Sequence, residues 1–191
     1  MNKIDRNLRA RELGSQLPLG TQLILDQPCV PGADREIAFD FNQTLDLFVP
    51  TGPGPFPLIC WIHGGGWSSC NKDVDFTSQV LGLGFALASF DYRLTSDGFP
   101  FPAQIEDCIS DLRWLRQKGA RYRVDTDRMG MFGHSAGAHL SALIATTRGT
   151  NPFKSLTGIS TQVQAVVLWL GPLDLGREHG LRPKVFPGRG L

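Results

Sequence analysis

The chain has 191 residues, of which 41% are apolar and 19% are charged, and its formal net charge is +1. This composition is ordinary for a globular protein and argues against disorder along the whole chain. The small net charge argues against nucleic acid or an anionic membrane surface as the main partner, because both need a concentrated basic face.

The length predicts one domain over residues 1–191, with a ragged N-terminus at 1–20 and an irregular tail at 176–191. Residues 1–20 lack the apolar run of a secretory signal, and no stretch of the sequence resembles a membrane-spanning helix. The scattered cysteines fit neither a metal pattern nor a disulfide framework. We therefore expect a cytoplasmic protein with reduced thiols.

Two hydrophobic patterns predict the strands. Apolar and polar residues alternate in segments 35–41 and 43–50, which predicts strands with one buried face. Continuous apolar runs predict strands that are covered on both faces, at 58–62, 85–90 and 163–170. A further short strand is expected at 128–133.

Segment 102–119 is the clearest helix, because its apolar residues recur every three or four positions and form one stripe. Pro102 suits its first turn and Gly119 suits its end. A helix of small residues should follow Ser135, and segment 71–84 gives a weaker helical signal. Strands that alternate with helices predict an α/β protein with a largely parallel sheet.

The segment GHSAG, residues 133–137, places a serine between a predicted strand and a predicted helix. A serine on such a sharp turn has strained backbone angles, and glycines two residues away on either side leave room for it. The turn exposes the hydroxyl and points the helix N-terminus at it, which favours developing negative charge. Ser135 is therefore a candidate nucleophile, the alternative being a helix start chosen only for packing.

The segment HGGGW, residues 63–67, follows the apolar run at 58–62 directly. Three glycines can present backbone N–H groups to a reacting oxygen without side chains in the way, which is the chemistry of an oxyanion hole. A flexible turn or a phosphate-binding loop are the alternatives, but no G-K-[ST] or G-x-G-x-x-G pattern is present. His63 is a candidate base, but it precedes the glycines, and we interpret it instead as a residue that shapes the loop.

These motifs, in this order, resemble the α/β-hydrolase superfamily. Within it the chain is similar to the HGGGW-type esterases, which include the hormone-sensitive-lipase group and the bifunctional feruloyl and acetyl-xylan esterases. The resemblance rests on HGGGW, GHSAG and three further segments: DYRL at 91–94, FPAQIEDCISDLRWLR at 101–116 and VQAVVLWLGPLDL at 163–175.

The resemblance implies a serine carboxylic-ester hydrolase that forms an acyl-enzyme on Ser135 and needs no metal or organic cofactor. It implies an oxyanion hole made by the N–H groups of Ala136, Gly65 and Gly66, with Gly64 as a further donor. Trp67 is expected to line the acyl pocket. The substrate would be a small-molecule ester or an ester on a polysaccharide.

The same resemblance implies structural roles for several other residues. Asp91, Tyr92 and Arg93 would tie a loop near the active edge of the sheet, and Asp107 would serve as a helix cap or dipole partner. His134 and His139 lie on the turn and helix of Ser135 itself. We interpret both as packing or solvent-facing residues.

The sequence departs from the superfamily pattern after Ser135. The triad order is serine, acid, histidine, with the last two on loops after late strands. Segment 176–191 is rich in glycine, proline and arginine and indicates a truncated or frameshifted end. Asp174 and His179 leave open an improvised triad with Ser135, although only a short irregular segment separates them.

Two expectations follow from this departure. The first is that the chain alone is catalytically inactive or very weak, which is the alternative to an active esterase. The second concerns the strand at 163–170, which would lack a neighbour and present an open apolar edge. We therefore expect the chain to self-associate, to dissolve poorly or to be completed by a second polypeptide.

Overall fold

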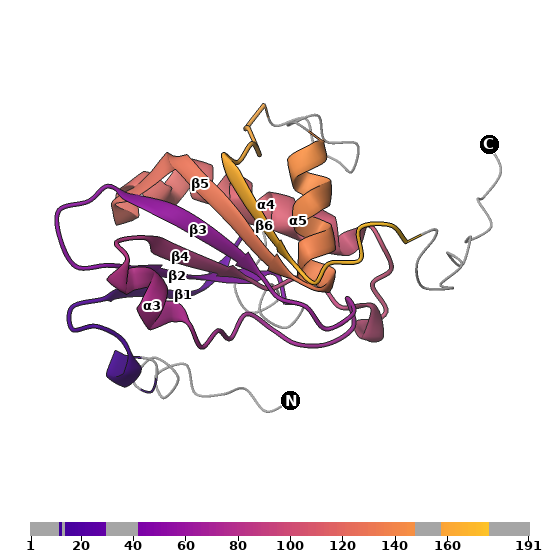
Figure 1. Cartoon of the computed structure of the whole chain (residues 1–191), viewed down its shortest axis with the longest axis horizontal. Coiled ribbons are helices and arrows are strands. Elements are labelled where there is room, and N and C mark those ends of the chain that lie inside the picture. Colours follow the sequence, from indigo (N-terminus) through magenta and orange to yellow (C-terminus); the bar gives the residue numbers. More distant parts are fainter. Residues whose placement is uncertain (1–11, 13, 30–41, 148–157, 176–191) are drawn as a thin grey trace.

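A mixed six-stranded sheet organises the structure, a computed structural model that describes residues 12, 14–29, 42–147 and 158–175 (Figure 1). The strand order is β1-β2-β4-β3-β5-β6. β1 and β2 run antiparallel to their neighbours, whereas β4, β3, β5 and β6 are parallel. The strands are β1 Gln22–Pro28, β2 Thr44–Val49, β3 Phe56–Ile62, β4 Ala86–Phe90, β5 Val124–His134 and β6 Ala165–Trp169.

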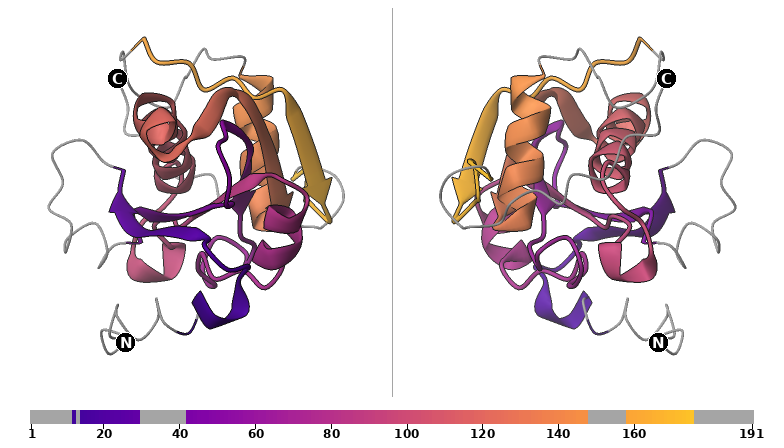
Figure 2. Two further views of the ribbon diagram at one scale, coloured as in Figure 1. Left: turned by 90° about the vertical axis from the view of Figure 1, so that its left-hand side faces the viewer. Right: turned by 90° about the vertical axis from the view of Figure 1, so that its right-hand side faces the viewer.

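In the described segments between the strands, the structure has three α-helices and two short 3₁₀ turns. They are α3 Thr77–Gly82, η1 Thr95–Asp97, α4 Ala103–Lys118, η2 Gly119–Tyr122 and α5 Ala136–Thr146. Helices α4 and α5 cover one face of the sheet and α3 covers the other (Figure 2). This layering confirms the predicted α/β class with a mostly parallel sheet.

Alternation along the strands divides the core between the two faces. In β3, Leu58, Cys60 and Ile62 pack on the side of α4 and α5, while Trp61 packs on the side of α3. The apolar stripe predicted for segment 102–119 is buried in the larger cluster, through Ile105, Cys108, Ile109, Leu112 and Leu115. A strand buried on both faces reads as a continuous apolar run, which is why β3 and β4 were predictable.

Most of the predicted elements are confirmed, with changes at their ends. The segments predicted at 43–50, 58–62, 85–90, 128–133 and 163–170 contain strands, and those at 71–84 and 102–119 contain helices. The strand predicted at 35–41 lies outside the described residues. β5 begins earlier than predicted, because the polar residues at its start hide the strand pattern.

The sequence analysis missed β1, and its irregular register explains why. The pairing of β1 with β2 shifts between Ile24 and Gln27. Asp26, in that shift, has a positive φ of 51° and is buried. A bulge of this kind interrupts the alternation that would otherwise reveal a strand.

The prediction that the strand at 163–170 is buried on both faces is wrong. β6 is an edge strand of the sheet, and in the described part of the chain β5 alone pairs with it. Its side chains are therefore open to solvent, with Val167 55% and Trp169 52% exposed. Leu170 and Leu173 extend this apolar surface beyond the end of the strand.

Candidate active site

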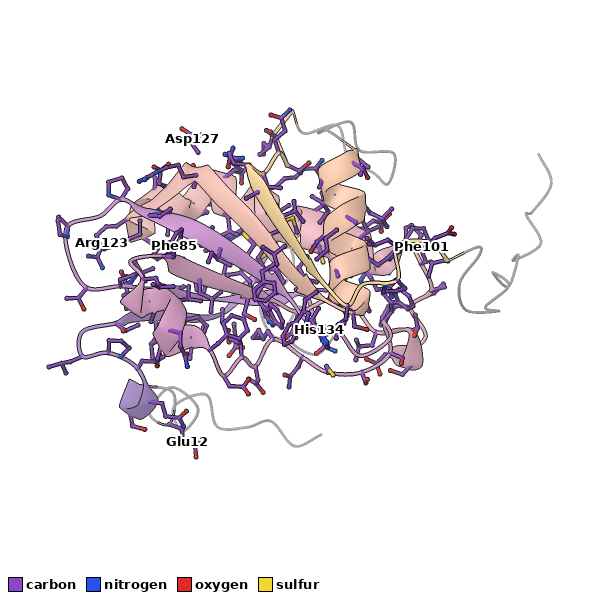
Figure 3. The ribbon with its side chains drawn as sticks, in the orientation of Figure 1. Glu12, Phe85, Phe101, Arg123, Asp127 and His134 are labelled. Atoms are coloured by element: carbon purple, nitrogen blue, oxygen red, sulfur yellow. The ribbon has the colours of Figure 1, made fainter. Side chains whose placement is uncertain are left out.

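The parallel strands bring the candidate residues to one edge of the sheet. Ile62 at the end of β3 is level with Phe90 of β4 and with Gly133 of β5. His63, Asp91 and Ser135 each follow the last residue of their strand, so they gather at the same carboxyl edge. This edge is where ligands bind in open α/β sheets. Figure 3 places His134 there, beside the start of α5.

Ser135 occupies a sharp turn between β5 and α5. Its φ of 51° and ψ of −116° lie in a region that L-residues rarely adopt. The N–H group of Ser135 donates a 2.8 Å hydrogen bond to the carbonyl oxygen of Trp169 in β6. The strained turn predicted from GHSAG is therefore present, and it is held by the neighbouring strand.

Both glycines of that motif are required by close backbone approach. A Cβ at Gly137 would lie 2.1 Å from the carbonyl oxygen of Ile62. A Cβ at Gly133 would lie 2.3 Å from the carbonyl oxygen of Gly137. Because both contacts are with backbone atoms, a side chain at either position would force the strands and the helix apart.

The glycine loop after β3 lies directly against the Ser135 turn. A Cβ at Gly64 would be 3.2 Å from Cβ of Ser135 and 2.9 Å from Nδ1 of His134. Gly65 and Gly66 both have positive φ, at 86° and 59°. The structure therefore brings together the two motifs that the sequence singled out, at residues 64–66 and 135–136.

The carbonyl group of Gly65 is turned into its own loop. It accepts hydrogen bonds from the N–H groups of Ser68 at 3.0 Å and Ser69 at 3.1 Å. On the other side of the site, Ala136 is the first residue of α5, and the first N–H groups of a helix have no intrahelical partner. Backbone N–H groups are therefore the donors that this site can offer to an anion.

Trp67 lies at the end of the glycine loop, with a positive φ of 60°. Its carbonyl oxygen accepts a 2.9 Å hydrogen bond from the N–H group of Thr95 in η1. Its partly buried ring meets the ring of His139 edge-on, with centroids 5.3 Å apart. Trp67 thus forms a wall between the glycine loop and α5.

The contacts of His63 are those of a residue that shapes the loop. Its Nδ1 lies 3.0 Å from the carbonyl oxygen of Gly64, and its ring stacks on Tyr92 with centroids 4.1 Å apart. Nε2 of His63 lies 3.9 Å from Oδ1 of Asp91. Burial lowers the pKa of His63, despite the nearby Asp91 carboxylate, and so favours the neutral ring.

His134 and His139 also fail to reach the serine hydroxyl. The His134 ring lies 5.0 Å from Trp169, and His139 packs on Trp67 with its Nδ1 buried and unbonded. Burial lowers the pKa of His139. In segments 42–147 and 158–175, no histidine donates to or accepts from the Ser135 hydroxyl. Asp174 lies exposed after β6, and His179 lies outside the described residues.

Arg93 and Asp107 form an ion pair of the scaffold, in which Asp107 is buried and Arg93 is partly exposed. Nε of Arg93 donates to Asp107 at 2.8 Å, and its Nη2 donates to the other carboxylate oxygen at 2.8 Å. Gln43 also donates to Asp107 at 2.8 Å. Asp107 has the structural role that was expected, but its carboxylate ties α4 to the chain after β4 and does not cap its own helix.

The sequence analysis missed Lys72, whose ammonium group is buried among carboxylates. Its Nζ lies 2.9 Å from Asp26 and 3.0 Å from Asp91, and 3.8 Å from Asp46. Burial by itself would lower the pKa of Lys72, but these carboxylates raise it above the ordinary lysine value. No local pattern reveals this cluster, since its members come from β1, β2, the residue after β4 and the segment that follows the glycine loop.

No cluster of three possible metal ligands exists among the described residues. In that part of the chain, no helix is long and apolar enough to cross a membrane. The groups that the described structure brings together at this edge are the Ser135 hydroxyl, backbone N–H groups and the ring of Trp67.

The comparisons with known proteins point to one family. The BD-FAE family model matches residues 45–184, which include the glycine loop and the Ser135 turn. The chain belongs to the BD-FAE family. Its fold is that of the α/β-hydrolase esterases, among them Est2 of Thermogutta terrifontis with propionate bound, which has a TM-score of 0.64 and 27% sequence identity. That comparison covers 87% of this chain and 60% of Est2.

Other relatives of this BD-FAE chain are also esterases. Carboxylesterase NlhH of Mycobacterium tuberculosis is 35% identical over 118 residues, covering 59% of this chain and 37% of NlhH. Esterase LipQ of the same species is 28% identical over 186 residues, covering 86% of this chain and 43% of LipQ. A truncated carbohydrate esterase from gut microbiota has a TM-score of 0.67 and 25% identity, covering 79% of this chain and 57% of that structure. The chain thus spans less than half the length of these two curated relatives.

Proposed function

We propose that this chain carries the nucleophile and the oxyanion-binding groups of a serine carboxylic-ester hydrolase. The observation that supports this most is the strained Ser135 turn beside the glycine loop, where a Cβ added to Gly64 would lie 3.2 Å from Cβ of Ser135. The proposed oxyanion donors are the N–H groups of Ala136, Gly65 and Gly66, with Gly64 as a further donor. Loss of one such donor costs about 2.7–4 kcal/mol of transition-state stabilisation in other enzymes.

In the proposed reaction, Oγ of Ser135 attacks the ester carbonyl carbon and gives up its proton to a base. The carbonyl oxygen becomes negatively charged and accepts hydrogen bonds from the backbone donors. The C–O bond then breaks, the alcohol leaves with a proton, and an acyl group stays on Ser135. Water attacks this acyl-enzyme and releases the acid.

This mechanism also needs a base that takes the proton of Ser135. The described histidines are held elsewhere, which favours a second candidate: a chain that binds esters and hydrolyses them weakly or not at all. His179 with Asp174 remains a proposed pair for an active chain. A hydroxyl without a base keeps only the contribution of the oxyanion hole and binding, roughly 10³–10⁴ over water.

The substrate proposed for this site is a small-molecule ester or an ester carried by a polysaccharide. Support comes from relatives that are called carbohydrate esterase and bifunctional GH43-CE, and from the propionate bound to Est2. Trp67 would line the pocket for the acyl group, since its ring lies between the glycine loop and α5. No cofactor and no nucleic acid enter this proposal.

We also propose that the open edge of β6 leads to self-association or to pairing with a completing chain. The exposed apolar side chains of Val167, Trp169 and Leu170 support this part of the proposal.

A cytoplasmic location fits the four free cysteines, three of which are buried.

Hydrolysis of a short-chain nitrophenyl ester by the purified chain tests the function, with Ser135→Ala beside it. The matched control is Ser110→Ala, which removes a hydroxyl that bonds only within α4, to the carbonyl oxygen of Glu106. Turnover that disappears in Ser135→Ala and persists in Ser110→Ala supports a working nucleophile. His179→Ala and His63→Ala then identify the base. Equal background rates in all variants would support the inactive alternative.

A further inference from the structure

The segment that follows the glycine loop is held against the sheet by Lys72. The N–H group of Lys72 donates to Oδ1 of Asp91 at 2.7 Å, and its Nζ lies 3.0 Å from Oδ2 of the same residue. The carbonyl oxygen of Lys72 accepts a 2.6 Å hydrogen bond from Oγ of Ser89 in β4. Both the backbone and the side chain of Lys72 are therefore fixed by the end of one strand.

The charges of this tie are buried. Lys72 is 3% exposed, Asp91 6% and Asp26 1%. A buried ammonium or carboxylate costs several kcal/mol unless it is paired, and Nζ of Lys72 also donates to Oγ1 of Thr44 at 2.6 Å. The ammonium group is thus held by oxygen atoms of Asp26, Thr44 and Asp91, and a shift of the backbone at Lys72 would have to break these contacts.

The near end of the loop is tied by Tyr92. Its hydroxyl oxygen lies 2.8 Å from the carbonyl oxygen of Gly64 and 3.1 Å from that of His63. The Tyr92 side chain is fully buried, and burial raises its pKa, so the hydroxyl stays protonated and donates. Nδ1 of His63 is the second group on the carbonyl of Gly64.

Together these contacts decide which way the glycine peptides face. The carbonyl groups of Gly64 and Gly65 are held, by Tyr92 and His63 on one side and by Ser68 and Ser69 on the other. A peptide whose carbonyl is fixed has its N–H fixed in the opposite direction, because the peptide unit is planar. The N–H group of Gly65 therefore takes its direction from the contacts of Tyr92 and His63, and the N–H group of Gly66 from the contacts of Ser68 and Ser69.

We infer that Tyr92, Asp91 and Lys72 are positioning residues, which set the oxyanion-binding N–H groups of residues 64–66 against Ser135. This inference rests on the proposed function. Its residues touch neither substrate nor nucleophile, so they act on the transition state through the loop. A displacement of about 1 Å at a reacting group can cost ~10²-fold in rate.

Tyr92→Phe is the sharpest test, because it keeps the ring that stacks on His63 and removes only the hydroxyl. We expect kcat to fall by about 10- to 100-fold while KM changes by less than about threefold, since the oxyanion exists only in the transition state. Tyr122→Phe is the matched control. It changes the other tyrosine of the chain, which stacks on Trp114 away from the loop, and should keep full activity.

A second measurement does not depend on turnover. Amide hydrogen exchange should accelerate at Ser68 and Ser69 in Tyr92→Phe, and at residues 63–72 in Lys72→Met. Exchange in α4 should stay unchanged. Lys118→Met, at the end of α4, is the control for Lys72→Met. If Lys72→Met does not fold, both the kinetics and the amide hydrogen exchange are measured on Tyr92→Phe alone.

The outcomes separate this inference from the proposed function. Unchanged exchange at Ser68 and Ser69 in Tyr92→Phe overturns the inference, whether or not the chain hydrolyses esters. In an active chain, faster exchange with an unchanged kcat overturns the inference as well. So does a loss in kcat/KM of Tyr92→Phe that comes entirely from a rise in KM. Failure of the proposed function is a different result: wild type and Ser135→Ala hydrolyse the ester equally slowly.

Discussion

The Ser135 turn and strand β6 are neighbours that differ sharply in their packing. One hydrogen bond joins them, from the N–H group of Ser135 to the carbonyl oxygen of Trp169. The turn is enclosed by Gly64, Ile62 and α5 with no room for an added methyl group, whereas the side chains of β6 are largely exposed. The proposed oxyanion-binding N–H groups thus come from local segments beside the Ser135 turn, in which Gly64 and Ala136 are buried and Gly66 is exposed. A group that accepts a proton from Ser135 would have to come from the open side.

Gly137→Ala changes the most tightly packed position of the Ser135 turn and should have the largest effect on stability. The new Cβ would lie 2.1 Å from the carbonyl oxygen of Ile62 and 2.4 Å from that of His63. We expect a loss of about 4 kcal/mol or more in the free energy of unfolding, measured by urea denaturation. Gly82→Ala is the control, because no heavy atom lies within 4 Å of a Cβ there. It should be neutral or stabilise by up to ~1 kcal/mol. A stable Gly137→Ala protein would contradict the described packing of the turn.

Asp111→Asn tests the packed side of the sheet through its pH dependence. Burial, with help from Asp107 and Asp91, raises the pKa of the Asp111 carboxyl well above its ordinary value. The folded chain therefore keeps this proton to a higher pH than the unfolded chain. The stability that the proton brings is complete below the unfolded pKa of ~3.9 and is lost as the pH rises through the folded pKa.

We therefore expect Asp111→Asn to gain about 1–3 kcal/mol over the wild type at pH 8 and little at pH 4. Denaturation curves across this range measure the difference. Asp125→Asn should show the opposite trend, because hydrogen bonding to Arg128 lowers the pKa of Asp125. A gain for Asp111→Asn that is equal at pH 4 and pH 8 would show that the carboxyl is not protonated by burial.

Val167→Lys tests the open side and should have the smallest effect on the folded monomer. Val167 is 55% exposed on the edge strand, so a lysine should change the free energy of unfolding by less than ~0.5 kcal/mol. Association through this edge should weaken, which sedimentation velocity measures as a shift toward the monomer. Leu83→Lys, at a 75% exposed residue beyond α3, adds the same charge away from β6 and should leave association unchanged. Equal sedimentation of both variants and wild type would argue against pairing at β6.

The sequence predicted those parts of the site whose residues are close together in the chain. GHSAG and HGGGW are short patterns whose glycines have a local steric reason, and the structure places both motifs side by side. The cluster around Lys72 was not predictable, because a buried ion pair joins residues that are far apart in sequence and leaves no periodicity. The bulge at Asp26 hid strand β1 for a related reason, since it serves that same cluster.

The apolar run at 163–170 shows the opposite error. It predicted a strand correctly, but composition alone cannot tell whether a neighbour covers that strand. The fold around Ser135 was thus readable from pattern, while burial at the edge of the sheet depends on what pairs with it.

The position of Trp169 makes it a natural optical reporter. Its ring stacks near Phe132 and His134, its side chain is 52% exposed, and its carbonyl oxygen holds the N–H group of Ser135. A partner that covers β6 should shift the fluorescence emission of Trp169 to shorter wavelength. Trp61 is only 8% exposed, so its emission should not change when β6 is covered. An acyl group attached to Ser135 should change the emission of Trp169 and also that of Trp67, which lies between the glycine loop and α5.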